Sequence, residues 1–226
     1  MESIPYELFL ERTGFPTRML GLLDHGAISQ IIPLRDMRII DAIIEMPDNY
    51  LFQLLRKIGL VGAPDIKVYG KSIIRPMSFD STQLYVGQAF VSRRKYTAII
   101  ENFQKLFRTN NGFYLLKGIS KLAAAIIIGK DTNGVSSLAH YIPPIIELHA
   151  GKAVIMDGIH RNFIIRASGT SMWSIIIDQA EVAFPTNVEP WESISIVDEK
   201  PEKKEDRFFD LRMHLFRDLN FVGIDG

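Results

Sequence analysis

One short stretch of the sequence combines an Asp-Gly turn with a histidine and an arginine. Asp157-Gly158-Ile159-His160-Arg161 follows the apolar run 153–156, and a further apolar-rich segment ends at Gly169. This order predicts a buried strand, a tight turn and a short helix. The first N–H groups of a helix have no intrahelical partner, and the helix dipole favours an anion beside them. The stretch therefore predicts an anion-binding site.

The two cationic residues of this stretch stand where a helix usually prefers acidic ones. His160 and Arg161 fall in the expected first turn, where Asp or Glu would complement the dipole. A bound phosphate would reconcile this local conflict. Two structural alternatives remain open: Asp-Gly is also an ordinary turn, and Arg161 could simply pair with a neighbouring carboxylate.

Other familiar sites are incomplete or missing in the sequence. Gly129-Lys130-Asp131 is the nearest match to a Walker A loop, but Ala124 stands where the first glycine belongs and Asp131 where the hydroxyl belongs. The chain has no cysteine, which excludes disulfides, thiolate catalysis and cysteine zinc sites. The five histidines are scattered at 25, 140, 149, 160 and 214, so we predict no metal site.

The composition is that of an ordinary globular protein. Hydrophobic residues make up 47% of the 226 positions, and 26 basic residues balance 26 acidic ones. A zero net charge does not favour broad DNA or RNA binding, although a local basic patch stays open. No apolar run reaches the ~18 residues of a membrane span, and no signal-peptide pattern opens the chain. We expect a cytoplasmic protein without membrane contact.

The first part of the chain, residues 1–65, is expected to form a helical subdomain. Leu34, Met37, Ile40 and Ile44 are three or four residues apart, which is typical of the buried face of a helix. Pro47-Asp48 is expected to open another helix, because proline suits a first helical turn. Its buried face would contain Tyr50, Leu51, Leu54, Leu55 and Ile58.

The middle part, residues 66–185, is expected to mix strands and helices. Strands are predicted at 66–74, 145–148, 153–156 and 173–177, with a hairpin turn at 150–152 and further turns at 110–112 and 131–134. Ser92 is a suitable N-cap for a helix through Phe107, whose apolar side would contain Ile99, Ile100, Phe103, Leu106 and Phe107. The segment 115–128 is ambiguous, and its alanines favour helix in the first half.

The last part, residues 186–226, is expected to be a linker followed by a helix. The mixed charges of 198–206 indicate a solvated loop. Phe208, Leu211, Leu215 and Leu219 predict a helix over 207–219. The final four residues look more like a turn inside a domain than a chain end, so the sequence is also compatible with a piece of a longer protein.

The order of strand, Asp-Gly-x-His-Arg, helix and glycine resembles the ParB/sulfiredoxin superfamily. The approach Tyr141-Ile142-Pro143-Pro144-Ile145-Ile146-Glu147-Leu148 is similar to that family's, and so is Ser81-Thr82-Gln83-Leu84-Tyr85. The resemblance covers about residues 66–185. It implies an α/β (α+β) fold with a small mixed sheet and flanking helices, to which the helical residues 1–65 would be an addition.

The resemblance implies that Gly158, His160 and Arg161 hold the phosphates of a nucleotide such as ATP, ADP or CTP, with or without Mg²⁺. Asp157 would cap the turn or help to hold a metal that accompanies the nucleotide. Asp157, His160 and Glu147 are candidate catalytic residues, and Asp80 is a further carboxylate.

The chain also departs from this family. Ile159 stands where sulfiredoxins have their catalytic cysteine, and the acidic residue of the ParB Gly-Glu-Arg-Arg motif is missing, which puts CTP hydrolysis in doubt. Three classes therefore stay open: an NTPase or phosphotransferase, a regulatory or DNA-associated module, and a degenerate structural copy. Arg93-Arg94-Lys95 is either a solvated face or a second phosphate or nucleic-acid contact.

Overall fold

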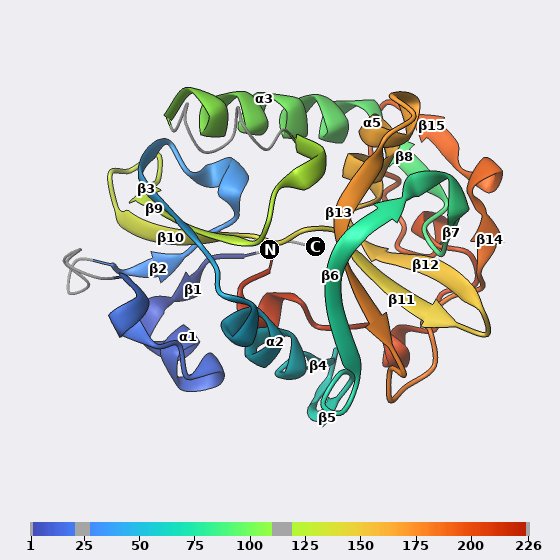
Figure 1. The fold of residues 1–226 in the computed structure, drawn as a ribbon, viewed down its shortest axis with the longest axis horizontal. Helices are drawn as coiled ribbons and strands as arrows, with labels where there is room; N and C mark the ends of the chain where they lie inside the picture. Colours follow the sequence, from blue (N-terminus) through green and yellow to red (C-terminus); the bar gives the residue numbers. More distant parts are fainter. Residues whose placement is uncertain (1, 21–27, 110–118, 225–226) are drawn as a thin grey trace.

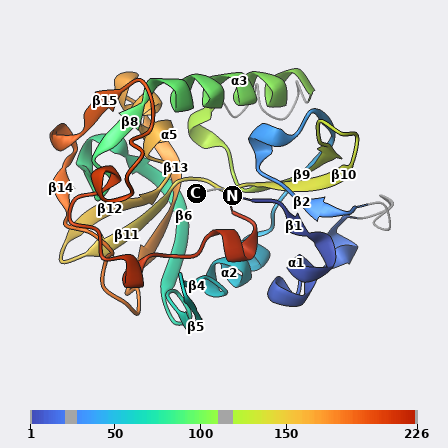
Figure 2. The ribbon, with the colours of Figure 1, turned by 180° about the vertical axis from the view of Figure 1, so that it is seen from behind.

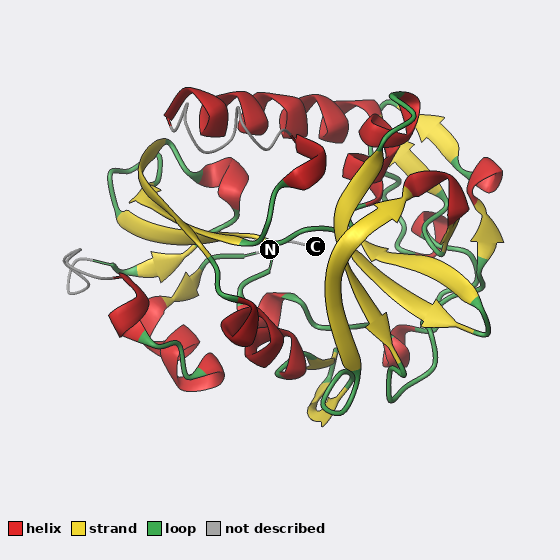
Figure 3. Ribbon diagram, in the orientation of Figure 1, coloured by secondary structure: helices red, strands yellow, loops and turns green. Residues whose placement is uncertain are grey.

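Two β-sheets, with helices around and between them, form a mixed α+β fold (Figures 1 and 3). The computed structural model describes residues 2–20, 28–109 and 119–224. In these ranges the α-helices are α1 (Tyr6–Thr13), α2 (Asp48–Arg56), α3 (Arg93–Thr109) and α5 (Ile159–Ala167).

The five-stranded sheet draws its strands from two distant parts of the chain. In spatial order it consists of β1 (Ile4–Pro5), β2 (Gln30–Ile31), β10 (Ser136–Tyr141), β9 (Ala125–Lys130) and β3 (Ile39–Glu45). β2 and β10 are parallel, and the other neighbours are antiparallel. The first 45 residues therefore complete a sheet whose centre comes from residues 125–141.

The six-stranded sheet holds the predicted strand-turn-helix stretch near its middle. Its order is β14 (Glu189–Pro190), β7 (Leu84–Val86), β12 (Lys152–Asp157), β11 (Ile145–His149), β13 (Ser171–Asp178) and β6 (Ile73–Asp80). Two small pairs accompany it, β8 (Phe90–Ser92) with β15 (Ser195–Val197) and β4 (Gly59–Leu60) with β5 (Ala63–Lys67).

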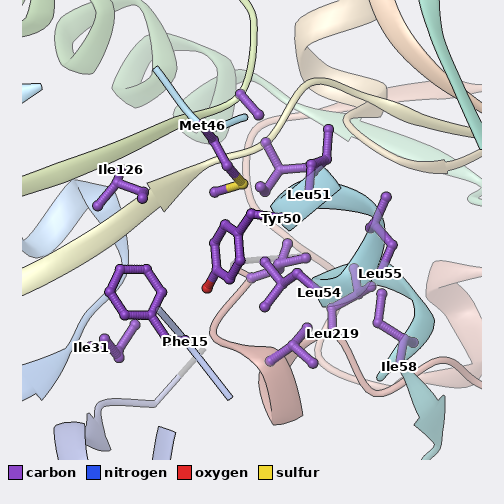
Figure 4. Close-up of a cluster of buried hydrophobic side chains, with 14 of the residues drawn as sticks. Phe15, Ile31, Met46, Tyr50, Leu51, Leu54, Leu55, Ile58, Ile126 and Leu219 are labelled. Carbon is purple, nitrogen blue, oxygen red and sulfur yellow. The ribbon is translucent and has the colours of Figure 1, made fainter. Parts of the chain in front are cut away.

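The largest buried cluster joins both sheets through α2. In Figure 4 Tyr50 of this helix points toward Phe15, near Ile126 of β9 and Ile31 of β2, and Leu51, Leu54 and Leu55 lie on its other side. The same cluster includes residues from the six-stranded sheet, namely Ile74, Ile145, Ile175 and Ile177. A continuous apolar core therefore holds the two sheets together.

Two further segments cross from one sheet toward the other. α3 runs along one side of both sheets, above them in Figure 1, and contacts α5 and the short 3-10 helix η3 (Leu34–Asp36). The C-terminal segment, residues 198–224, runs from the six-stranded sheet toward the five-stranded sheet on the side seen in Figure 2. It ends beside the five-stranded sheet, where the Gly223 carbonyl is 3.1 Å from Nδ1 of His140.

Several sequence predictions are confirmed. The mixed α+β class is correct, α2 begins after Pro47, and β11 and β12 form the predicted hairpin. Ser92 accepts a hydrogen bond at Oγ from the Lys95 N–H (3.3 Å) before α3, as expected of an N-cap. β13 covers the predicted strand at 173–177, and a turn closes with a bond from the Gly134 N–H to the Asp131 carbonyl (3.2 Å).

The predicted helix over Leu34–Ile44 is wrong. This segment forms η3 and then β3, which pairs with β9 along the edge of the five-stranded sheet. The β-branched isoleucines of β3 favour the strand, and pairing with β9 satisfies their backbone groups. Residues 1–65 are therefore not a helical addition, and the boundary expected at residue 65 does not separate them from the five-stranded sheet.

The predicted C-terminal helix over 207–219 is also wrong. Much of the backbone there bonds to distant segments: the Arg212 N–H donates to the Pro185 carbonyl (2.7 Å), and the Phe216 carbonyl accepts from the Val61 N–H (2.8 Å). Asp210 has a left-handed φ of 51°, which no α-helix contains. Within 208–219, the 3-10 helix η8 (Met213–Leu215) is a single turn, and the rest of the segment is not helical.

Smaller expectations have mixed outcomes. Ala125 begins β9, so the alanines at 123–125 do not extend a helix, and Ile100 of α3 is exposed. The strand expected over 66–74 is divided between β5 and β6. Three expectations lie outside the described part of the chain. They concern the turn at 110–112, the position of His25, and the side chains of Phe103, Leu106 and Phe107.

Candidate functional site

The start of α5 has the geometry expected of an open helix N-terminus. Gly158 is the N-cap residue with a left-handed φ of 91°, and the first intrahelical bond runs from the Asn162 N–H to its carbonyl (3.0 Å). No side chain caps this end, and the first turn contains no acidic residue. The N–H groups before Asn162 and the helix dipole therefore favour a negative group at this end.

Arg161 is held by its neighbours within the same turn. Its Nη2 donates to Asp157 Oδ2 (2.8 Å), and its Nη1 donates to the Ile142 carbonyl. The guanidinium also lies 5.6 Å from the centre of the Tyr141 ring. Arg161 therefore pairs with a neighbouring carboxylate, and the Asp157 carboxylate is engaged in this ion pair.

His160 is a buried, neutral ring. Its Nε2 accepts a hydrogen bond from the Ser92 N–H (3.1 Å). Burial, helped by the nearby charges of Lys95, Arg161 and Lys200, lowers its pKa to about 3. The His160 side chain therefore brings no positive charge at neutral pH, and a ring that accepts at Nε2 carries its proton on Nδ1.

The start of α5 lines a cavity of about 450 Å³ between the two sheets. Tyr141 of β10 and Met156 of β12 lie in its wall, so both sheets contribute. α3, η3, the C-terminal segment and the loops at 87–88 and 184–186 contribute further lining residues. Apolar and aromatic side chains form much of it, among them Phe90, Ile99, Phe184, Phe208, Phe216 and Leu219. Concave, largely apolar cavities with a few charged groups are the usual form of small-ligand sites.

Cations outnumber carboxylates in the described lining of this cavity. Seven Lys or Arg residues line it against two Asp residues, although the whole chain has equal numbers of each sign. The cations are Arg35, Lys95, Arg161, Lys200, Lys204, Arg207 and Arg217, and the carboxylates are Asp157 and Asp218. Such a concentration raises the local potential and attracts anions.

Glu147 lies in a buried polar network that includes one wall residue of the cavity. Its carboxylate accepts two bonds from Arg217, from Nε to Oε1 (2.9 Å) and from Nη2 to Oε2 (2.7 Å). Tyr69 and His149 also bond to it, at 2.5 and 2.7 Å. Burial alone would raise the pKa of Glu147, but these bonds and the Arg217 charge hold it below its ordinary value.

Asp80, Arg93 and Arg94, also candidates from the sequence, make structural interactions. Asp80 caps the 3-10 helix η4 (Ser81–Gln83) by accepting from the Thr82 N–H (2.9 Å), and this bond, the largest cause, lowers its pKa. Arg93 and Arg94 pair with Asp198 (3.7 Å) and Glu199 (3.1 Å) on the surface. Of the basic triplet, only Lys95 lines the cavity.

The sequence prediction of Gly158, His160 and Arg161 missed the cations that face the same cavity. Lys200 and Lys204 belong to the charge run 198–206, which was interpreted as a solvated loop, and Arg207 follows it directly. A spacing of four and three residues aligns side chains on a helix surface, but residues 200–204 are not helical, so this spacing was no signal. Arg35 and Arg217 carried no local signal either.

Comparisons with protein-family models, with curated proteins and with solved structures found no match for this chain. In the described residues no group of three or more His, Asp or Glu side chains is placed to hold a metal ion. None of the described helices combines the length and the apolar character needed to cross a membrane.

Proposed function

We propose that this chain binds a nucleotide in the cavity between its sheets, with a phosphate at the start of α5. The observation that carries the proposal is the excess of cations in the lining of a largely apolar cavity. An open helix N-terminus supplies backbone donors to an anion, and aromatic side chains supply a surface for a base.

The three predicted residues would contribute in different ways. Gly158 places the chain in the left-handed turn that begins the helix, and His160 contributes its backbone N–H. Arg161 keeps donor atoms beyond its bonds to Asp157 and Ile142, because a guanidinium has five N–H groups. A phosphate could therefore bind beside the Arg161–Asp157 pair without breaking it.

The proposal concerns binding and leaves the choice between an enzyme and a regulatory module to experiment. Of the carboxylates in the described lining, Asp157 pairs with Arg161, and Asp218 accepts the Phe221 N–H (3.0 Å). Glu147 is buried in its own network outside that lining. None of these arrangements favours a particular catalytic base.

A thermal-shift experiment tests the proposal. The protein is melted with ATP, ADP, CTP or GTP, each with and without Mg²⁺, and with adenosine and cytidine as phosphate-free controls. A ligand that binds only the folded state raises the melting temperature. We expect at least one nucleotide to do so and its nucleoside to have a much smaller effect. The proposal would be contradicted if a nucleotide and its nucleoside raised the melting temperature equally, or if no nucleotide raised it.

Two variants connect the result to the site. Arg161→Gln should reduce the nucleotide shift, whereas Arg75→Gln should not, because Arg75 lies on β6 and its side chain is 58% exposed. Phosphate release from a bound nucleotide would favour the enzyme, and binding without release would favour the regulatory module. Salt-sensitive binding of duplex DNA, with no nucleotide shift, would favour the DNA-associated alternative.

A further inference from the structure

Four cations from two distant segments gather at the same cavity. Lys95 extends from the first turn of α3, whereas Lys200, Lys204 and Arg207 belong to the loop after β15. The parallel pairing of β15 with β8 brings these segments together, with Val197 opposite Ser92. We call Lys95, Lys200, Lys204 and Arg207 the loop cluster.

Hydrogen bonds fix the loop in this position. Ser92 donates through Oγ to the Asp198 carbonyl (3.1 Å), which also accepts from the Arg94 N–H (3.3 Å). Arg207 donates from Nε to the Pro201 carbonyl (2.7 Å) and from Nη2 to the Glu202 carbonyl (2.5 Å). The loop is therefore arranged before any ligand binds, which lowers the entropic cost of binding.

The acidic residues at the start of the loop form ion pairs with α3, away from the cavity. Asp198 pairs with Arg93 and Glu199 with Arg94, both on the exposed side of α3. These pairs leave Lys200 and Lys204 on the cavity side. The acidic and basic residues of this run are thus divided in space, with Lys200 and Lys204 toward the cavity.

The members of the loop cluster repel one another. Burial and then the charges of Arg207, Lys95, Lys204 and Arg35 lower the pKa of Lys200. Lys95 and Lys200 also act on His160 in the first turn of α5, so the cluster adjoins the proposed phosphate position. A bound anion would relieve this repulsion.

We infer that the loop cluster is a second anion subsite beside the start of α5, and that the ligand is a polyphosphate with two or more phosphoryl groups. This inference rests on the proposed nucleotide binding. One phosphate at the start of α5 would leave the loop cluster without a bound anion of its own. A diphosphate or triphosphate can place its remaining groups among Lys95, Lys200 and Lys204, where each charge-assisted hydrogen bond strengthens binding.

Calorimetric titration of a phosphate series tests the inference. The wild-type protein is titrated with the mono-, di- and triphosphates of adenosine and of cytidine, and with inorganic tripolyphosphate. We expect affinity to rise at least about tenfold from the mono- to the triphosphate of the base that binds, which is the gain from one charge-assisted hydrogen bond. Tripolyphosphate binding would show that the phosphates alone suffice for recognition.

The double variant Lys200→Gln/Lys204→Gln should abolish this rise while leaving monophosphate affinity within about threefold of wild type. Lys203→Gln is the matched control, because Lys203 is an exposed residue of the same loop that does not line the cavity. Both lysines of the double variant are exposed, and equal melting temperatures without ligand would show that the fold is intact.

The two proposals fail in different ways. If mono- and triphosphates bind the wild-type protein equally well, or if the double variant keeps the tenfold rise, the polyphosphate inference is wrong and nucleotide binding stands. If no member of either series binds, both proposals are wrong.

Discussion

The Glu147–Arg217 ion pair joins β11 to the C-terminal segment at a high cost in lost hydration. Both side chains are fully buried, so each loses its hydration, and the gain depends on satisfying every donor and acceptor. Arg217 meets this condition with bonds from Nη1 to the carbonyls of Ala183 (2.9 Å) and Leu215 (2.7 Å). The pair thereby fixes the C-terminal segment on β11 and places a wall of the cavity.

His140 gives a pH dependence that can be measured. Its Nδ1 lies 3.1 Å from the Gly223 carbonyl and so carries the proton, while no described group bonds to the buried Nε2. Burial, only partly offset by the Gly223 bond, lowers its pKa from 6.5 to about 4. The unfolded chain binds this proton first as the pH falls, so folding stability is complete above pH 6.5 and is lost toward pH 4.

Urea unfolding at pH 7.5 and pH 5 measures this effect. We expect His140 alone to account for a loss of about 2 kcal/mol over this interval. His140→Gln should reduce the loss by that amount, and His214→Gln, which changes an exposed residue, should leave it unchanged. An equal loss of stability in wild type and His140→Gln would contradict the assignment.

At the residue scale, the sequence predicts interactions within a turn better than interactions between segments. The spacing of Asp157 and Arg161 already allowed their ion pair, because an arginine in the first turn of a helix can reach back to the residue before the N-cap. Arg217 and Tyr69 are 70 and 78 positions from Glu147, and no local pattern indicates that they meet. The sequence therefore predicted Glu147 only as a catalytic candidate. Its buried partners could be identified only from the fold.

At the element scale, α5 and its flanking turns act as one unit. Gly158 opens the helix and Gly169 follows it, both with left-handed φ values of 91° and 66°. An added Cβ at Gly158 would lie 2.8 Å from Cβ of Pro144, whereas at Gly169 it would meet nothing within 4 Å. The first glycine therefore serves close packing as well as backbone conformation, and the second serves conformation alone.

Alanine substitutions separate these two contributions. Gly169→Ala should destabilise the fold by about 1 kcal/mol, the cost of a left-handed conformation with a Cβ. Gly158→Ala should cost about 2–3 kcal/mol, because the clash with Pro144 adds to that cost. Chemical denaturation measures both values. Equal costs at the two positions would show that the turn opens freely around Pro144.

The elements predicted wrongly share a physical cause. Leu34 to Ile44 and Phe208 to Leu219 have apolar residues at helical spacing, but spacing describes one chain segment and says nothing about its partners. β3 is fixed by pairing with β9, and the C-terminal segment by bonds to Pro185 and Val61. α2 and the β11–β12 hairpin were predicted correctly because their caps, turns and apolar faces are local.

At the scale of the whole molecule, the two sheets share one core. Leu54 of α2 is fully buried in the cluster that includes Ile126 of one sheet and Ile175 of the other (Figure 4). The division predicted at residues 65 and 185 does not follow the sheets, because β2 and β3 lie beside β9 and β10. We expect the sheets to unfold together.

Leu54→Ala tests this expectation. It should lower the free energy of unfolding by about 2–5 kcal/mol, as usual for a buried leucine. Fluorescence of Trp173 and Trp191, both at the six-stranded sheet, and far-UV circular dichroism should give one common midpoint. Ile66→Ala is the control, since Ile66 is 51% exposed. Separate midpoints for the two signals would mean that the sheets unfold independently.

The parallel pairing of β2 with β10 also sets an order of events during synthesis. Gln30 lies opposite Ser137, which a ribosome adds 107 residues later, about 5–20 s at ordinary elongation rates. Throughout that interval β1 and β2 lack the strand that places them in the sheet. During this interval the growing chain exposes an unpaired strand edge. Chaperones that bind such edges would act on the segment that contains β1 and β2.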